Sequence, residues 1–599
     1  MKRALNDPEQ AFGLWKGHDE ISHNMFYIVP SSCPLPKARP DENDDEDQLM
    51  RYWINDCIEN HGSCNEYHPA YYPTRLLDLV RFGSSGDIVL TEREEDHDRH
   101  ITYTTLSHCW GATTNRPLTT NLANLASRKS CIPFDELPLT FQDAVTTTRK
   151  LNIPYLWIDS LCIIQDSPND WEKEAGRMAK IYAGSVCTLS ALGSKDSNGG
   201  FFRVAEKEMD CVFRYDLTLA SQRIRVFPSE PNTWVLDGPL MGRAWTLQER
   251  ELSRRVLHLA RDKLLWECET LKASVDLPWL QYPAPDSGPA RDLLYDSAAE
   301  AALGQYCHPI TLRRRWFETV QDYSKRKMTI SKDKLIALSG LAHSYSEREV
   351  LIRPRDDTWK GGRRGKDAAG LWEADMPSAL LWRTWSAQRP SDYWAPSWSW
   401  ASVDGAVSYD SQMLYSNMPY SEELSEFMRL GDGPPYPRYS SEYDFGAFCL
   451  KEIEIKPSSS DSTGAVSAGH ITLTGLVAIA IIGKDTNTIF QSGSYFPYTF
   501  LRDQDCLVVG ALIPDVPTEA RPNNIYCVSV RDEQKSAMVS VPWALYNEYD
   551  SDRFEMVMGL GLTRIGEDEN GKVLRSLGLV RWVRKSLFAG KEVSTMKII

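Results

Sequence analysis

The chain has no apolar run long enough to cross a bilayer. Its most apolar stretch, LVAIAIIG at residues 476–483, is far shorter than the roughly 20 residues that a spanning helix needs. The opening residues, MKRALNDPEQ, have charges but no apolar segment behind them, so a secretory signal is not expected. We therefore expect a cytoplasmic protein without a membrane span.

Paired cysteines and a basic surface are also lacking. The 13 cysteines have no paired spacing, which fits reduced thiols in a cytoplasmic protein better than a disulfide framework. The formal net charge of −15 argues against nucleic acid as the main partner, because phosphate binding needs a basic surface. We attribute the negative charge to solubility.

The composition that remains is typical of a soluble globular protein, and its 599 residues predict about three to four domains. Residues 1–50 include the acidic run DENDDED and are expected to be mobile. Residues 51–275 predict an α/β domain with an N-terminal extension, and residues 276–420 predict a mainly helical region. Residues 421–469 are expected to form a linker. Residues 470–599 contain short β runs that predict an antiparallel β unit.

Apolar strands alternate with amphipathic helices in the α/β domain. Strands are expected at residues 102–107, 155–158, 186–192, 256–259 and 264–268. A helix is expected at residues 141–151, and Ser167 is expected to cap another that has Pro168 in its first turn. Four residues of that helix fall on one face, which predicts a core stripe: Trp171, Ala175, Met178 and Tyr182.

Polar side chains gather where two of these strands end. The segment YTTLSHCWG at residues 103–111 ends a strand with Ser107 and His108, and YLWIDS ends the next one with Asp159. Ligands bind outside the carboxyl ends of the strands of an open α/β sheet. If the two strands are parallel, these side chains share one edge of the sheet.

A third segment, RAWTLQERELSR at residues 243–254, predicts a helix with Trp245 and Glu249 on one face. An indole beside a carboxylate can stack a planar ring while the acid acts on an adjacent ribose. The structural alternative is a partly buried tryptophan and a glutamate paired with a nearby arginine.

Together these segments resemble the fungal heterokaryon incompatibility (HET) domain: YTTLSHCWG, YLWIDSLCIIQDSPNDWEKEAGRMAKIYAGS and RAWTLQEREL, over about residues 100–270. The resemblance implies a fungal cytoplasmic protein of non-self recognition and regulated, programmed cell death. It also implies other HET-domain or incompatibility proteins as partners, and self-association into a homo-oligomer.

The HET domain is in turn similar to Toll/interleukin-receptor (TIR) domains, which have a flavodoxin-like, mostly parallel sheet with flanking helices. Many TIR domains cleave NAD with a glutamate in a Trp-Cys-x-x-Glu-Leu helix. In this chain WTLQE matches the Trp and the Glu, whereas Thr246 replaces the Cys and Arg250 stands where Leu is expected. The resemblance implies NAD as a substrate, no bound cofactor, and Glu249 as the catalytic residue. The substrate-binding residues that it implies are Ser107, His108, Asp159, Trp245 and Arg243.

Two other functions remain open. A non-catalytic death-signalling adaptor would work through HET-domain self-association. A thiol hydrolase would use Cys109 or Cys162 with His108 and Asp159, although His108 and Cys109 point to opposite faces of a strand. A dehydrogenase is not expected, because no Gly-x-Gly-x-x-Gly loop follows the first strand.

The segment CIENHGSCNEYH contains four residues of metal-ligand type: Cys57, His61, Cys64 and His68. On a continuous helix they would span about 16 Å at 1.5 Å per residue, too far for one tetrahedral ion. A break at Gly62 would let three of them converge. We expect structural packing here and no metal.

Overall fold

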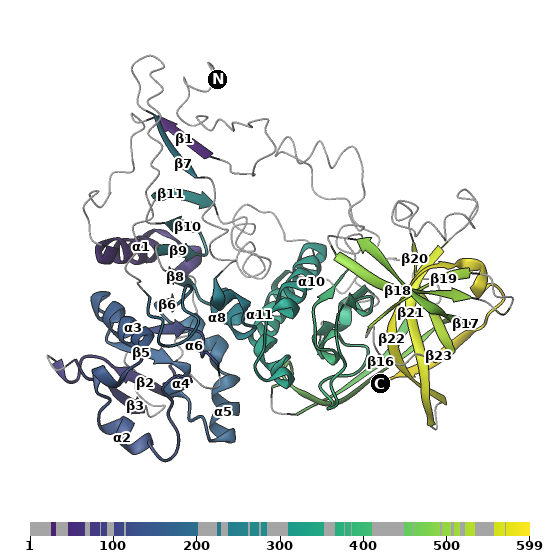
Figure 1. Cartoon of the computed structure of the whole chain (residues 1–599), viewed down its shortest axis with the longest axis horizontal. Helices are drawn as coiled ribbons and strands as arrows, with labels where there is room; N and C mark the ends of the chain where they lie inside the picture. Colours follow the sequence, from purple (N-terminus) through teal and green to yellow (C-terminus); the bar gives the residue numbers. More distant parts are fainter. Residues whose placement is uncertain are drawn as a thin grey trace. The chain divides into compact units, whose positions relative to one another are not determined.

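The fold is taken from a computed structural model of the chain (Figure 1). It divides into two compact units, residues 1–285 and 286–599, each of which is considered by itself. The structure describes residues 26–30, 46–65, 72–83, 86–92, 101–112, 116–201, 224–228, 238–260, 264–274, 277–283, 309–352, 366–376, 378–384, 386–409, 448–458, 461–491, 494–502, 504, 508–515, 522–533, 556–568 and 571–599.

The N-terminal unit is built on a nine-stranded sheet, which confirms the predicted α/β class. Its strands in spatial order are β11 (Leu277–Pro283), β10 (Leu271–Ser274), β9 (Leu264–Cys268), β8 (Arg255–Leu259), β6 (Cys187–Ser190), β4 (Tyr103–Ser107), β5 (Tyr155–Ile158), β2 (Arg75–Asp78) and β3 (Val89–Glu92). The central strands β5, β4, β6 and β8 are parallel. Antiparallel strands extend the sheet at both edges.

Helices cover both faces of this sheet. They are α1 (Glu46–Asn60), α2 (Leu125–Ser130), α3 (Leu139–Lys150), α4 (Asp159–Cys162), α5 (Pro168–Ala175), α6 (Met178–Gly184) and α8 (Trp245–Glu251). Figure 1 shows α1 and α3 on one side and α5, α6 and α8 on the other. Apart from the sheet, β1 (Phe26–Pro30) pairs with β7 (Ile224–Pro228). Both β1 and the start of α1 fall within residues 1–50, which the sequence assigned to a mobile segment.

The helix predicted after the second strand begins as expected but does not continue. The Ser167 side chain accepts a hydrogen bond from the Asp170 backbone N–H, and Pro168 is in the first turn. The chain then leaves the helix at Gly176, a residue that disfavours helix interiors, and restarts as α6. The predicted single helix is therefore wrong, although three of its four stripe residues are buried: Ala175, Met178 and Tyr182.

The C-terminal unit begins with two helices, α10 (Pro309–Lys325) and α11 (Ile336–Ile352). The region predicted to be mainly helical also contains strand β11 (Leu277–Pro283). Its described residues after α11 form short 3-10 turns and four two-residue strands: β12 (Asp367–Ala368), β13 (Leu371–Trp372), β14 (Arg383–Thr384) and β15 (Val407–Ser408). Aromatic residues make the core here. The indoles of Trp316 and Trp400 both donate hydrogen bonds to the Gly370 carbonyl, at 3.2 and 2.9 Å.

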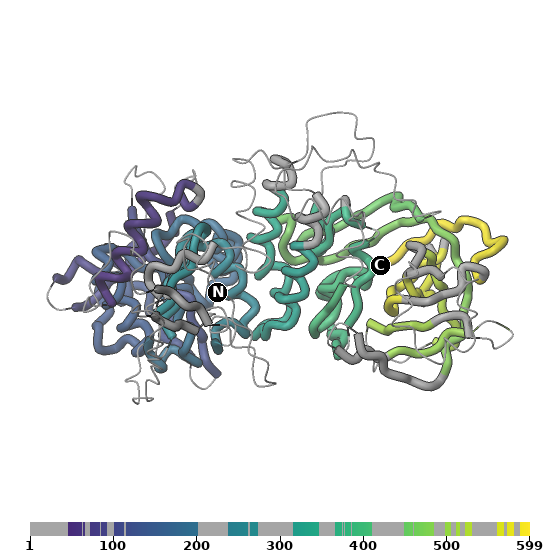
Figure 2. Tube along the Cα trace, turned by 90° about the horizontal axis from the view of Figure 1, so that it is seen from above, coloured from purple at the N-terminus to yellow at the C-terminus, as the bar shows by residue number. Residues whose placement is uncertain are grey.

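An eight-stranded sheet completes this unit (Figure 2). It contains β16 (Cys449–Pro457), β17 (Val466–Gln491), β18 (Ser494–Arg502), β19 (Val508–Pro514), β20 (Asn524–Glu533), β21 (Met556–Asp568), β22 (Gly571–Arg584) and β23 (Val593–Ile598). All its pairings are antiparallel except that of β22 with β23, and β20 also pairs with β17. The strand β16 falls inside residues 421–469, which the sequence assigned to a linker.

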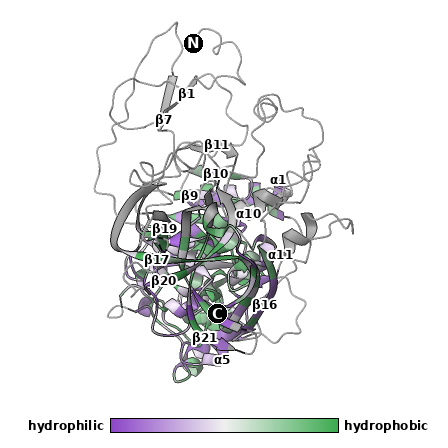
Figure 3. Ribbon diagram, turned by 90° about the vertical axis from the view of Figure 1, so that its right-hand side faces the viewer, coloured by the Kyte–Doolittle hydropathy of each residue, from purple (hydrophilic) through white to green (hydrophobic). Residues whose placement is uncertain are grey.

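Figure 3 colours the described residues by hydropathy, with apolar residues in green and polar residues in purple. The most apolar stretch of the chain, residues 476–483, lies within β17, where Ala478 and Ala480 are buried. Among the described residues, no helix combines the length and the apolarity that a membrane crossing requires.

Replacing Gly370 by Ala should destabilise the C-terminal unit. Gly370 has φ +85°, and an added Cβ would lie 2.9 Å from the Trp400 Nε1 atom. The left-handed backbone and the overpacking together predict a loss of about 3 kcal/mol. Thermal unfolding followed by tryptophan fluorescence would measure it. Gly566→Ala is the control, because no atom lies within 4 Å of its added Cβ; equal shifts in the two variants would contradict the prediction.

Candidate functional site

The first segment of the site is the end of β4, where consecutive side chains point to opposite faces of the sheet. Ser107 points to the face covered by α8, where it meets the glutamate of that helix. The ring of His108 packs edge-on against Phe141 of α3, with 5.1 Å between ring centroids. The structure therefore places these two predicted binding residues in different layers.

The predicted catalytic carboxylate lies in α8, directly after the turn η5 (Pro239–Gly242). Glu249 points inward and is only 5% exposed. Ser107 Oγ donates a hydrogen bond to Glu249 Oε2, which joins residues 142 positions apart in the sequence. The hydroxyl of Tyr182 on α6 donates a hydrogen bond to the Leu106 carbonyl at 3.3 Å, and its proximity to Glu249 favours the ionised carboxylate. Glu249 is thus fixed against the carboxyl end of β4.

Burial shifts the pKa values of two side chains of the site, Glu249 and His108. Burial, and next the negative charge of Asp159, raise the pKa of Glu249 to about 7. The Ser107 hydrogen bond and the positive charge of Arg243 favour the ionised form but have smaller effects. Burial lowers the pKa of His108 to about 4 in spite of the nearby Asp159. At neutral pH the site therefore combines a carboxyl group that readily exchanges its proton with an uncharged imidazole.

Asp159 lies at the junction of β5 and α4, at the same edge of the sheet. Its carboxylate accepts hydrogen bonds from Trp110 Nε1 at 2.8 Å and from the Ser160 backbone N–H at 2.7 Å. Its Oδ1 atom is 3.7 Å from His108 Nδ1. Asp159 therefore ties the turn after β4 to the end of β5, the position where ligands bind in such sheets.

The rim of the site is formed by its partly exposed members. Arg243 and Trp245 are both half-buried, as are Trp110 and Asp159. Arg243 Nη1 donates a hydrogen bond to the His108 carbonyl, which holds a cation at the turn after β4. Trp245 packs against the main core of the unit.

A layer of buried polar side chains next to this site was not predicted from the sequence: Ser190, Arg250, His258 and Glu267. His258 lies 3.2 Å from Ser190 Oγ and 2.9 Å from Glu267 Oε2 through its two ring nitrogens. Arg250 binds Glu267 with two hydrogen bonds, of 2.9 and 2.8 Å. The arginine next to Glu249 is therefore engaged elsewhere. Ser190 could have been found, because it lies near the carboxyl end of the strand predicted at residues 186–192, but the partner of Arg250 has no local signal.

The two candidate nucleophilic thiols have no activating base. Burial raises the pKa of Cys109 to about 11 and that of Cys162 to about 12. Cys109 packs among apolar residues such as Leu192 and Leu240. Among the described residues, no group hydrogen bonds to either ring nitrogen of His108. This geometry does not support a thiol hydrolase.

The strand order defines the class of the domain. The parallel strands stand in the order β5–β4–β6–β8, which is 2-1-3-4 along the chain and is the flavodoxin-like order. The order reverses between β4 and β6, the point where these sheets bind ligands. Ser107 and Ser190 are paired across that point. The N-terminal unit is therefore a flavodoxin-like α/β domain with a polar site at its topological switch point.

Comparison with protein families identifies this domain further. The family model described as heterokaryon incompatibility protein (HET) matches residues 103–249, from the first residue of β4 to the site glutamate. The chain therefore contains a HET domain, as the sequence predicted, and this supports a role in heterokaryon incompatibility. Searches of curated proteins and of solved structures found no match.

Replacing Glu249 by Gln should stabilise the protein above neutral pH. The pKa of Glu249 in the folded state, about 7, exceeds its ordinary value of 4.5. The folded protein therefore has its full stability below the ordinary pKa and loses part of it as the pH rises from 4.5 to about 7. We expect Glu249→Gln to raise the free energy of unfolding by about 3 kcal/mol at about pH 8 and by little at about pH 4.

Denaturant unfolding at both pH values would measure this difference. Glu172→Gln, on the exposed surface of α5, is the control and should show no such dependence on pH. A stability difference for Glu249→Gln that stays constant across this pH range would contradict the raised pKa.

Proposed function

We propose that the HET domain hydrolyses NAD at the nicotinamide–ribose bond, with Glu249 as the catalytic carboxylate, and that the resulting NAD loss drives incompatibility-linked cell death. The observation that carries the proposal is a buried glutamate with a pKa of about 7 at the switch point of a flavodoxin-like sheet. Strongly perturbed carboxyl groups in such positions are characteristic of active sites.

The chemistry needs one anionic side chain. As the bond between ribose C1′ and the nicotinamide nitrogen breaks, nicotinamide leaves with the electron pair and positive charge develops on the ribose. A carboxylate in a water-poor site stabilises that charge. Water then adds its hydroxide to C1′ and releases a proton. Glu249 is suited to this role in its ionised form.

The rim residues supply binding groups for the rest of the dinucleotide. Trp245 is half-buried and offers an indole for stacking, while Arg243 offers a cation for phosphate. Asp159 can accept a hydrogen bond from a ribose hydroxyl if the ligand displaces Trp110 from it. Ser107 orients Glu249 through its hydrogen bond.

A death-signalling adaptor is the second candidate. The observation that favours it is that Glu249 is buried and already hydrogen bonded inside the domain by Ser107, as a structural residue would be. Such an adaptor would act through self-association of the HET domain, without chemistry. It would leave NAD intact while forming oligomers at high protein concentration.

Purified protein incubated with NAD should release nicotinamide, and Glu249→Gln should reduce the rate by about 100-fold or more. Glu251→Gln is the matched control, because Glu251 lies in the same helix but pairs with Arg250 at 3.5 Å. Chromatography of nicotinamide and ADP-ribose would measure the rates, with circular dichroism to verify folding. No nicotinamide release by wild-type protein, alone or as an oligomer, would favour the adaptor; full turnover by Glu249→Gln would exclude the assignment of Glu249.

The pH dependence of NAD cleavage should report the ionisation of Glu249. Because the ionised form stabilises the transition state, the rate should rise with pH through the Glu249 pKa of about 7. Asp159→Asn removes a negative charge that raises this pKa and should move the acid limb to lower pH. Ser107→Ala removes a hydrogen bond that lowers it and should move the limb to higher pH. Midpoints that move in the same direction in both variants would contradict this assignment.

A further inference from the structure

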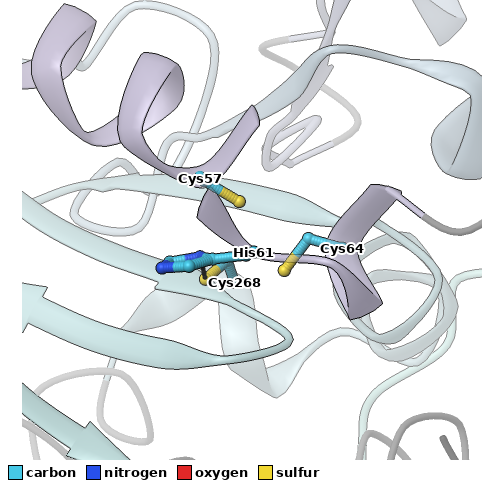
Figure 4. Close-up of side chains that lie close together, drawn as sticks. All are labelled: Cys57, His61, Cys64 and Cys268. Atoms are coloured by element: carbon cyan, nitrogen blue, oxygen red, sulfur yellow. Dashed lines mark hydrogen bonds between the residues drawn. The ribbon is translucent and has the colours of Figure 1, made fainter. Parts of the chain in front are cut away.

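A cluster of sulfur and nitrogen ligands lies in the N-terminal unit, apart from the site of Glu249 (Figure 4). Cys57, His61, Cys64 and Cys268 each present one ligand-type atom, and these atoms all lie within 4.8 Å of one another. All four residues are buried. His61 Nδ1 is 3.5 Å from Cys268 Sγ. Three of the four come from one short segment, and the fourth comes from a strand some two hundred residues later.

The local backbone explains how the short segment converges. Cys57 and His61 are four residues apart, and the His61 N–H still bonds to the Cys57 carbonyl at 3.2 Å. The helix α1 ends at Asn60, and Gly62 leads into the turn η2 (Ser63–Asn65), which carries Cys64 back toward the helix end. The break at Gly62 that would let three ligands converge is therefore present. His68 lies outside the described residues.

The fourth ligand comes from the sheet register. Cys268 is the last residue of β9 and shares a face with Trp266, which stacks on Trp53 of α1 at 6.2 Å between ring centroids. The prediction of packing without metal considered the ligands of one segment only. Cys268, from a distant strand, supplies the fourth ligand that this segment lacks.

We propose that Cys57, His61, Cys64 and Cys268 bind a structural zinc ion. A tetrahedral ion with Zn–S of about 2.3 Å and Zn–N of about 2.0 Å holds its ligand atoms about 3.5–3.8 Å apart. The distance between His61 Nδ1 and Cys268 Sγ has this value. Three thiolates and one imidazole form a closed ligand set of the kind found in structural zinc sites, with no position left for water.

Hydrogen-bond donors surround the sulfur atoms as thiolates require. Arg255 Nε donates to Cys57 Sγ at 3.1 Å, and the Leu271 backbone N–H donates to Cys268 Sγ at 3.3 Å. The Thr270 hydroxyl lies 3.3 Å from Cys64 Sγ. Each of the three sulfurs thus has a donor of its own, provided by three different kinds of group. Donors of this kind orient and stabilise metal-bound thiolates.

The charged residues around the cluster complement the net charge of a zinc ion bound by this ligand set. A zinc ion with three thiolates and a neutral imidazole has a net charge of about −1. The buried guanidinium of Arg255, the cross-strand neighbour of Cys268, supplies the opposite charge. His61 turns Nδ1 to the cluster and Nε2 toward the Asp56 carboxylate at 3.8 Å. A carboxylate behind the second nitrogen is the usual partner of a zinc-bound histidine.

The zinc would fasten the N-terminal extension to the sheet. It would join α1 and η2 to the end of β9, beside the stacked pair Trp53 and Trp266. This role does not depend on the chemistry of Glu249, which lies on the opposite face of the sheet. Metal binding can therefore be tested without reference to the proposed NAD hydrolysis.

Metal analysis of the purified full-length chain tests the proposal. Wild-type protein prepared under reducing conditions without chelator should contain about one zinc per chain, and Cys268→Ser and Cys64→Ser should contain almost none. Cys187→Ser is the matched control, because it removes a buried thiol from β6 outside the cluster, and it should keep its zinc. Glu249→Gln should also keep it. Wild-type protein without zinc, with iron in its place, or with a disulfide within the cluster would overturn the proposal.

Cobalt substitution tests the site in the wild-type chain, even if the cysteine variants do not fold. Co²⁺ added to chelator-stripped protein should give the visible bands of a tetrahedral ion and near-ultraviolet thiolate charge-transfer bands, and zinc should remove both. Asp56→Asn should bind the metal about 10- to 100-fold more weakly. Octahedral cobalt spectra, or spectra without thiolate bands, would overturn the assignment.

Discussion

The free energy needed to keep the Glu249 carboxyl group away from water is the constraint on which the HET domain's site depends. The Glu249 side chain accepts a hydrogen bond from the Ser107 hydroxyl, and the adjacent arginine binds Glu267 instead. An apolar side chain would fill the same position without the desolvation penalty. The buried acid therefore costs free energy, and the proposed stabilisation of positive charge on the ribose would give that cost a function.

The two faces of the sheet have different chemistry because strand side chains alternate. On the face covered by α6 and α8, polar residues such as Ser190, His258 and Glu267 form a connected layer beside Glu249. On the other face Trp53 and Trp266 stack, and the cysteine–histidine cluster lies next to them. A slip of one residue in the register of β9 would exchange Glu267 with Cys268 and disrupt both layers.

What the sequence predicted was local, and what it missed depends on distant partners. The strands at residues 155–158 and 264–268 have the predicted bounds, because apolar runs bounded by polar turns define short buried strands. The cap by Ser167 was equally readable. The placement of Ser107 and Asp159 at one edge of the sheet followed from the rule on strand ends. In contrast, the pairing of Arg250 with Glu267 and the arrival of Cys268 at the cluster depend on packing between distant segments, which no local spacing encodes.

Strand β9 connects the two chemical centres of the domain. Glu267 points to one face and holds Arg250, the residue next to Glu249, while Cys268 points to the other face and joins the cluster under α1. A metal ion bound at Cys268 would fix the end of β9, and with it the carboxylate that anchors α8. The position of α8 thus depends on β9, whereas β9 does not depend on the Glu249 side chain. Loss of the metal would loosen a strand that helps to position α8, whereas loss of the Glu249 carboxylate removes no contact of β9.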